Sequence, residues 1–325
     1  MWRRGVVLFC CLLTLSGCTS VVSGSAVPNE AASALSARLG GADGGLGELS
    51  TVDFCSLLDG KAIKDLARHQ NVEFGSLDFC VLYAEADGED IQVSVELSNP
   101  PPDVHGLDLE RRDWLPDPLR VGSHEDIYGG CEAGIFFKDR KAVLAFAARS
   151  KPDEEGEPAV DRDDLCDIAD ALREAAATVI VEGRVKHADY AAKSLGPVDP
   201  CTLLSNQQIN KAMPTTYGHR VGTPSRHRCR WGLDAELEVA AEISDWPLDE
   251  EVYASETLAG RPSFVYTSKD DEYAYCEVVT ANIEDAPGTR ETMSVLVSAK
   301  VDKPDPCVAA RAVAALVWPQ LPAAS

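Results

Sequence analysis

Eight cysteines in two sets of four constrain this chain more than any other feature of its sequence. The gaps within the first set are 25, 51 and 35 residues, and those within the second set are 28, 47 and 31. An even number of cysteines at a repeated spacing is typical of a disulfide framework in an exported protein. The spacing therefore predicts two repeats, each about the size of one small domain. The two sets are Cys55, Cys80, Cys131 and Cys166, and Cys201, Cys229, Cys276 and Cys307.

We expect each disulfide to join the start of a helix to a strand. Four cysteines allow three connectivities, and the sequence leaves the other two open for each repeat. On the loop-entropy estimate, each bridge would contribute about 3 to 4 kcal/mol of stability. The favoured pairs are Cys55 with Cys80, Cys131 with Cys166, Cys201 with Cys229, and Cys276 with Cys307.

Helix starts are indicated by an Asp that lies two residues before the first or fourth cysteine of each set. Asp is a preferred N-cap, and in two of the four cases a Pro follows it at the first helical position. Ser205 and Gln208 form a capping box that predicts a helix reaching Met213. Asp59 takes the equivalent place before a helix expected over 61–69. The four residues are Asp53, Asp164, Asp199 and Asp305.

The middle of each repeat alternates apolar and polar residues, which is typical of half-buried strands. This alternation is clearest over 91–98 and 237–244, and further strands are expected over 134–137, 142–147, 263–267, 275–281 and 293–301. Closing helices are expected over 165–179 and 308–317. The predicted fold class is α+β. It consists of two tandem related domains, each an antiparallel sheet flanked by N- and C-terminal helices and stapled by two disulfides.

The first 17 residues have the organisation of a lipoprotein signal peptide. Arg3 and Arg4 precede an apolar run that is too short to span a bilayer, and 15–18 have the order of a lipobox. We expect cleavage before Cys18 and attachment of acyl chains such as palmitate to it. The lipid anchor would hold the protein on the extracytoplasmic face of the cell membrane. An ordinary secreted protein is the alternative.

The remaining boundaries follow from composition and from the repeats. Residues 18–50 are rich in Ser, Gly and Ala, which predicts a lipidated Cys followed by a flexible tether. The first repeat is expected over 51–182, a linker over 183–196, the second repeat over 197–320 and a short tail over 321–325. The sequence does not distinguish a free linker from a docked strand at 183–196.

The charge of the chain restricts its partners. The formal net charge is -23, and it becomes -25 when Arg3 and Arg4 are removed with the signal peptide. Such a surface repels nucleic acid and anionic headgroups. The expected partners are the membrane, through the anchor, and an envelope protein, peptide or polymer.

The text around the second set of cysteines resembles a known group of proteins. Asp199-Pro200-Cys201-Thr202-Leu203-Leu204, Cys229-Arg230-Trp231 and Asp305-Pro306-Cys307 are similar to actinobacterial lipoproteins grouped as a domain of unknown function. The layout is also similar to four-Cys extracellular sensor domains of mycobacterial lipoproteins and receptor kinases. The first repeat matches weakly, because Phe54 replaces Pro and Cys80-Val81-Leu82 replaces Cys-x-Trp. The resemblance implies an α+β envelope protein and no catalytic residue.

No catalytic, metal or cofactor signature is found after the signal peptide. Serine-hydrolase elbows, H-E-x-x-H, Walker loops and dinucleotide-binding glycines do not occur. The acidic run 161–167 lacks the spacing and Gly of an EF-hand loop, and we expect it to cap a helix. The candidate ligand contacts are Arg220, Arg226, His227 and Arg228, because Arg forks suit carboxylates and phosphates; the alternative is charge balance with nearby acids.

Three functions remain open. The leading hypothesis is a non-catalytic binding or sensor-type interaction module. A carrier of a lipid or another apolar ligand is the alternative, and an unrecognised hydrolase is the third. Desolvated acids or His in a cleft would favour the enzyme, an apolar hollow the carrier, and an exposed aromatic patch without a cavity the interaction module.

Overall fold

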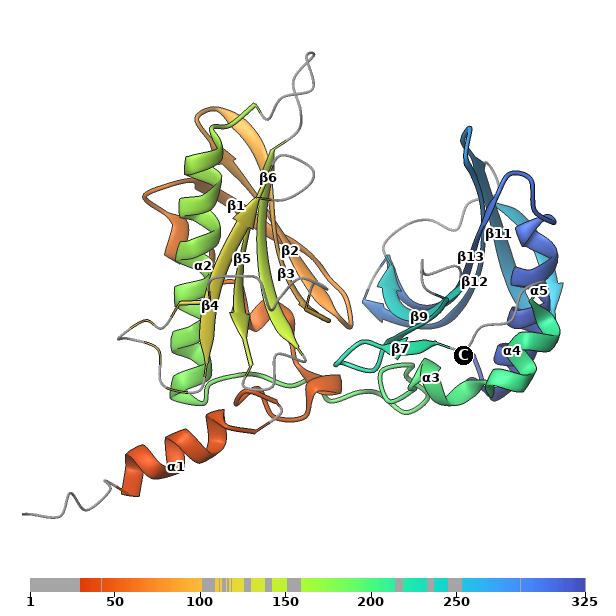
Figure 1. The fold of residues 1–325 in the computed structure, drawn as a ribbon, viewed down its shortest axis with the longest axis horizontal. Helices are drawn as coiled ribbons and strands as arrows, with labels where there is room; N and C mark the ends of the chain where they lie inside the picture. The colour runs from red at the N-terminus through yellow and green to blue at the C-terminus, as the bar shows by residue number, and fades with distance from the viewer. Residues whose placement is uncertain are drawn as a thin grey trace, which may run out of the picture.

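The chain forms two antiparallel sheets that lie side by side, and a helix covers one face of each (Figure 1). The computed structural model describes residues 30–41, 43–100, 109–110, 112, 115, 117, 119–125, 130–137, 142–150, 159–213, 219–232, 237–244, 253–286 and 288–324. The predicted signal peptide, 1–17, and the predicted lipidation site, Cys18, lie outside these residues. None of the helices in the described ranges combines the length and apolarity needed to cross a membrane.

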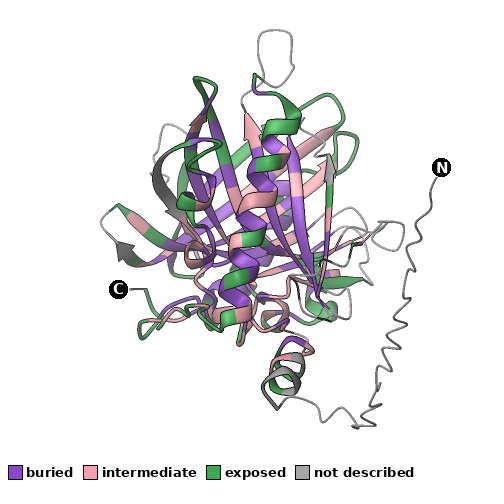
Figure 2. Cartoon of the chain, turned by 90° about the vertical axis from the view of Figure 1, so that its left-hand side faces the viewer, coloured by how far each residue is buried: buried purple, intermediate pink, exposed green. Residues whose placement is uncertain are grey.

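The first half packs a six-stranded sheet against one long helix. Short helices come before the sheet: α1 (Glu30–Leu39), η1 (Leu49–Thr51), η2 (Phe54–Leu57) and η3 (Gly60–Ile63). The strands are β1 (Arg68–Gly75), β2 (Phe79–Ala86), β3 (Glu89–Ser98), β4 (Arg120–Glu125), β5 (Cys131–Phe136) and β6 (Val143–Ser150). Helix α2 (Arg162–Glu182) buries its apolar stripe, including Leu165, Ile168 and Leu172, against this sheet (Figure 2).

The second half has a seven-stranded sheet and a shorter covering helix. It opens with α3 (Pro200–Leu203) and α4 (Asn206–Ala212) and closes with α5 (Pro306–Val317) and η4 (Trp318–Gln320). The strands are β7 (Arg220–Gly222), β8 (Arg228–Trp231), β9 (Leu237–Ser244), β10 (Ala254–Leu258), β11 (Arg261–Lys269), β12 (Tyr273–Ala286) and β13 (Thr289–Lys300). Val313, Val317 and the indole of Trp318 fill the space between α5 and the sheet.

The strands of the two halves follow the same order. The first sheet runs β1-β2-β3-β6-β5-β4, and the second runs β7-β8-β9-β13-β12-β11 with β10 added at its far edge. The register also agrees around the cysteines, because the second cysteine of each set faces a valine that in turn faces a core residue on the next strand. These aligned residues are Cys80, Val95 and Phe146 in the first sheet and Cys229, Val239 and Val295 in the second.

All four disulfides form with the favoured pairing. Cys55–Cys80 and Cys201–Cys229 join the short helix before each sheet to its second strand, and Cys131–Cys166 and Cys276–Cys307 join a later strand to the covering helix. Their Cα–Cα separations are 5.0 to 5.1 Å, inside the ordinary disulfide range. Four disulfides are typical of a protein that folds outside the cytoplasm.

The prediction of α+β halves built from antiparallel strands is confirmed, but three helix predictions need correction. The helix expected over 61–69 is only the η3 turn, capped by Asp59, and β1 begins at Arg68 because pairing with β2 overrides local helix propensity. Asp53 caps a 3-10 turn instead of an α-helix. Helix α2 is capped by Asp161 and not by Asp164, so it begins one turn earlier than predicted.

Apolar residues outside the predicted domain boundaries are also buried in the two cores. Leu39 and Leu46 of the expected tether lie in the first core, and glycines with positive φ between them allow the tight turns that bring them there. Leu321 of the expected tail lies in the second core. The expected linker 183–196 is docked: His187 forms a β-bridge with Val52, and Leu195 is buried in the second half.

A glycine on the first strand of each sheet packs against a disulfide. Gly75 faces Cys80 across its strand pair, and Gly222 faces Cys229 in the same way. A Cβ atom at Gly75 would lie 2.8 Å from the sulfur of Cys55, and one at Gly222 would lie 2.9 Å from that of Cys201. Both strands therefore exclude a side chain at the position where the disulfide crosses.

We predict that Gly75→Ala and Gly222→Ala each destabilise the protein by about 1 to 3 kcal/mol, because the added methyl overlaps a sulfur that the disulfide holds in place. Denaturant titration of the full chain would measure this cost. As a control, Gly222→Ala should cost much less when Cys201 and Cys229 are both replaced by Ala. An unchanged cost in that background would show that the disulfide is not what excludes the side chain.

Candidate functional site

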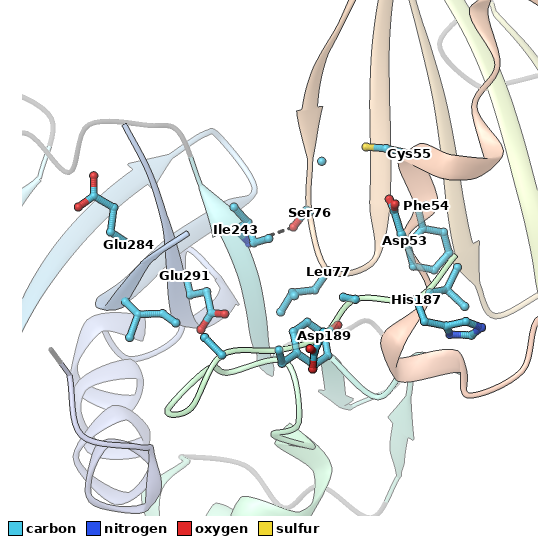
Figure 3. A pocket seen from close by; sticks show the side chains of 16 residues that line it. Asp53, Phe54, Cys55, Ser76, Leu77, His187, Asp189, Ile243, Glu284 and Glu291 are labelled. Atoms are coloured by element: carbon cyan, nitrogen blue, oxygen red, sulfur yellow. Dashed lines mark hydrogen bonds between the residues drawn. The ribbon is translucent and has the colours of Figure 1, made fainter. Parts of the chain in front are cut away.

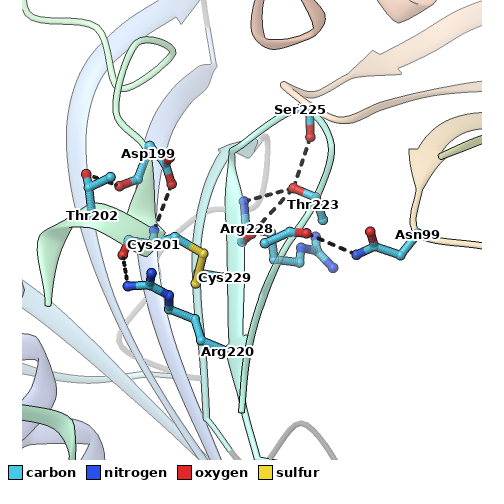
Figure 4. Close-up of a disulfide and its surroundings, with 10 residues drawn as sticks. Asn99, Asp199, Cys201, Thr202, Arg220, Thr223, Ser225, Arg228 and Cys229 are labelled. Carbon is cyan, nitrogen blue, oxygen red and sulfur yellow. Dashed lines mark hydrogen bonds between the residues drawn. A yellow bond between two sulfur atoms is a disulfide. The ribbon is translucent and has the colours of Figure 1, made fainter. Parts of the chain in front are cut away.

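The four residues predicted as ligand contacts are adjacent in sequence but serve different partners in the structure. The Arg220 guanidinium donates to the carbonyl of Cys201 at 2.9 Å, beside the disulfide drawn in Figure 4. Arg226 donates to the carboxylate of Glu48 in the first half. Arg228 donates to Glu242 at 2.7 Å. The three arginines of this segment thus contact carboxylates and a carbonyl of the chain itself.

His227, the fourth residue of this segment, is fully buried and joins the two halves. Its Nδ1 lies 2.8 Å from a carboxylate oxygen of Asp78, in the turn between β1 and β2, and its Nε2 lies 2.9 Å from the carbonyl of Gly196. Both ring nitrogens thus lie within hydrogen-bond distance of an oxygen atom. This enclosed His–carboxylate pair therefore holds the two halves against each other.

Other contacts of the same two turns fix the halves against each other. Leu77, beside Asp78, is buried in the hydrophobic core of the second half. The Ser76 hydroxyl accepts a hydrogen bond of 3.0 Å from the backbone N–H of Ile243, at the end of β9. On the other side, the Asn99 amide donates to the carbonyl of Gly222 at 3.1 Å (Figure 4). The junction therefore combines apolar burial with directional hydrogen bonds.

A pocket of about 410 Å³ lies beside this junction (Figure 3). Its volume falls within the range of small-molecule sites. Three parts of the chain line it: the first half through 52–55 and 75–77, the linker through 187–191, and the second half through Ile243, Ile283, Glu284 and Glu291.

The buried side of the pocket is held rigidly by Glu291. One of its carboxylate oxygens accepts a hydrogen bond from the Ser194 hydroxyl, and the other accepts one from the N–H of Leu195, each at 2.5 Å. Tyr190 donates its hydroxyl to the carbonyl of Ser50 at 2.7 Å, and burial, followed by the charges of Asp78 and Glu291, raises its pKa. The linker is therefore anchored to both halves where it passes the pocket.

The charge of the lining is negative. Four carboxylates contribute to it, namely Asp53, Asp189, Glu284 and Glu291, and no Lys or Arg is found among the described residues that line it. Its apolar surface comes from Val52, Phe54, Leu77, Ile243 and Ile283. The pocket therefore has the chemistry to accept a cationic group attached to a short apolar stem.

A second group of acids lies on the face of the second sheet that α5 does not cover. Glu238, Glu242 and Glu277 alternate with core residues on β9 and β12, and Arg228 lies among them. Burial, together with the charges of Glu242 and Glu238, raises the pKa of Glu277 to about 7. Burial also raises the pKa of Glu96, on the first sheet, although Arg228 opposes the rise.

The sequence analysis did not identify the lining residues of the pocket or Asp78. These residues come from segments up to about 240 positions apart, and none forms a local motif. One signal was available: Asp78 precedes Cys80 by two residues, and His227 precedes Cys229 by two. Aligning the two repeats on their cysteines would have drawn attention to this unlike pair.

Residues 183–320 match the model of a family described as a protein of unknown function (DUF3558). The match covers the docked linker and the second half, and it is consistent with the expectation of a family of unknown function. No curated protein matches the chain. Among solved structures, the chain is 12% identical to a conserved hypothetical protein of Mycobacterium tuberculosis with a double hotdog fold, over 83% of this chain and 91% of that one, with a TM-score of 0.11. A score of this size does not indicate a shared fold.

We predict that Glu277→Gln stabilises the protein increasingly as the pH rises from about 4.5 to about 7. Within this window the folded state keeps a proton on Glu277 that the unfolded state releases, so the free energy of unfolding falls as the pH rises. The neutral amide removes this dependence. Thermal unfolding at pH 4, 6 and 8 would show the two chains converging at pH 4 and separating at pH 8. Glu89→Gln, at an exposed site on the first sheet, is the matched control, and an equal gain from both substitutions would contradict the prediction.

Proposed function

We propose that this protein is a lipid-anchored, non-catalytic binding module of the cell envelope, and that its ligand binds in the pocket between the two halves. The pocket itself carries the proposal, since both halves and the linker line it and its carboxylates face no lining Lys or Arg among the described residues. A ligand bound there would contact both halves at once. Occupancy could then be transmitted to the arrangement of the halves, as a sensor requires.

The acidic and apolar residues of the lining favour a ligand that carries an amine on a short aliphatic stem. An ammonium group can donate three hydrogen bonds and would be attracted by the carboxylates, while the stem would cover Phe54, Leu77 and Ile243. Lysine side chains of peptides and amine-bearing envelope polymers offer this group. An apolar carrier is less well supported, because a lipid tail would remove the exposed carboxylates of Asp189 and Glu284 from water.

The proposed location rests on the sequence of the N-terminus and on the disulfides. The lipobox order before Cys18 predicts acylation, and the four disulfides are typical of oxidising compartments outside the cytoplasm. The anchored chain would present its folded halves to ligands at the outer face of the membrane.

We also propose that the halves are tandem copies of one domain. This proposal is supported by the shared strand order, the shared register around the cysteines, and the matching disulfides and strand glycines. Four independent agreements of this kind are difficult to produce by packing alone, because register and disulfide position are set separately.

Amine binding is tested with the chain from Thr19 to Ser325, purified from an exporting host with its disulfides intact. Native mass spectrometry would first detect any retained small molecule. Titration calorimetry with cadaverine, pentanol and glutarate would then compare an amine, a neutral and an acidic probe of similar length. We expect binding of cadaverine alone, weakened by salt because the attraction is electrostatic.

The variant Asp189→Asn/Glu284→Gln should lower the affinity for cadaverine by about tenfold, which corresponds to roughly 1.4 kcal/mol. Both carboxylates are exposed, so the fold should be unaffected. Asp65→Asn, at an exposed acid that does not line the pocket, is the control. Equal affinities of the wild type, the double variant and the control would rule out the pocket as the amine site.

The anchor is tested separately in the exporting host with an alkyne analogue of palmitate. The wild-type chain should incorporate the label and begin at Cys18, and Cys18→Ala should lose the label completely. Cys10→Ala and Cys11→Ala should keep it, because both residues leave with the signal peptide. Labelling that survives in Cys18→Ala would place the acyl chains elsewhere.

A further inference from the structure

The contact between Asp78 and His227 joins equivalent positions of the two halves. Each residue lies in the turn between the first two strands of its sheet, and each precedes a disulfide cysteine, Cys80 or Cys229, by two residues. Both side chains are buried, with exposed fractions of 5% and 0%. A residue that bonds its own equivalent in another copy lies on or near a two-fold axis.

The flanking contacts join corresponding segments on both sides, at positions one residue apart. Val95 and Val239 face the equivalent cysteines, so the residues four positions further along the chain are also equivalent; these are Asn99, directly after β3, and Ile243, in β9. Asn99 of the first half bonds Gly222 next to the second turn. Ile243 of the second half bonds Ser76, which follows Gly75, the counterpart of Gly222. Each half therefore uses the same strand end to hold the turn of the other.

We infer that the halves are related by a pseudo-two-fold axis between Asp78 and His227, and that each hairpin turn is a docking surface for a second copy of the same kind of domain. The inference rests on the proposed duplication but not on any ligand in the pocket. Self-complementary contact of this type is the usual interface of a two-fold dimer. The chain then corresponds to such a dimer fused through the docked linker.

The two residues at the proposed axis, Asp78 and His227, are called the axial residues. Because they differ, they determine which copies pair. Two first halves would bring two Asp78 carboxylates together at a buried site, where their repulsion is weakly screened. Two second halves would bring together two imidazoles that lack a shared carboxylate. Only the unlike pairing provides the hydrogen bond of 2.8 Å, so Asp78 and His227 favour association of a first half with a second half.

Exchanging the axial residues tests this inference in the full chain from Thr19 to Ser325. His227→Asp places two carboxylates on the axis, Asp78→His places two imidazoles there, and the double variant D78H/H227D restores an unlike pair in reverse. We expect each single variant to lower the midpoint of thermal unfolding by several degrees and to enlarge the radius of gyration in X-ray scattering. The exchanged chain should recover at least half of both changes. Full recovery is not expected, because the bond from His227 to Gly196 is made on one side only.

The exchanged chain decides the outcome. If it is as open and as unstable as His227→Asp, the two positions are not interchangeable and the axis is wrong. Asp78→Asn/His227→Asn provides a second measurement if a charged variant fails to fold, since two facing amides can bond each other and should keep the compact form; an open chain there would also overturn the inference. Cadaverine binding of each variant is measured separately, so that loss of the pocket and loss of the axis can be told apart.

Discussion

The buried contact between the two hairpin turns determines how the rest of the molecule is arranged. Leu77 is buried in the core of the second half, and the Asp78 carboxylate and the His227 imidazole contact each other across the junction. Breaking a buried pair by removing one partner typically costs 3 to 5 kcal/mol, because the remaining group stays desolvated. The halves therefore have a strong preference for one arrangement. The same contact also fixes part of the pocket wall, since Leu77 and Ser76 belong both to the turn and to the lining.

Local sequence signals predicted those parts of the fold in which neighbours in the chain are also neighbours in space. The alternating run 91–98 and the capping box at Ser205 and Gln208 appear as a strand and a helix, and the favoured disulfide pairs form. Each disulfide closes a loop of 25 to 35 residues between elements with clear local patterns. The predictions failed where a distant partner decides the conformation, as for β1, which forms because β2 offers a ladder of hydrogen bonds.

Local sequence signals could not predict the site either, because its residues are distant in the sequence. Asp78 and His227 are 149 positions apart, and the residues around each of them do not predict that its side chain is buried. From the sequence, His227 and its basic neighbours are interpreted as one patch. In the structure, Arg228 and Cys229 lie on opposite faces of β8, because side chains alternate along a strand, and Arg226 pairs with Glu48. A run of like charges in sequence is thus divided among three surfaces once the strand forms.

The docked linker explains why the two sides of the proposed axis differ. In a dimer of two separate identical chains, the side where Ser76 meets Ile243 and the side where Gly222 meets Asn99 would be the same. Here residues 187–191 join the first of these sides and complete the pocket, with Tyr190 fixed to Ser50 and Leu195 to Glu291. Under the proposed duplication, fusion of two copies would create a pocket that neither copy has alone. Such a fusion would also allow the two halves to diverge, and the second half has one additional strand, β10.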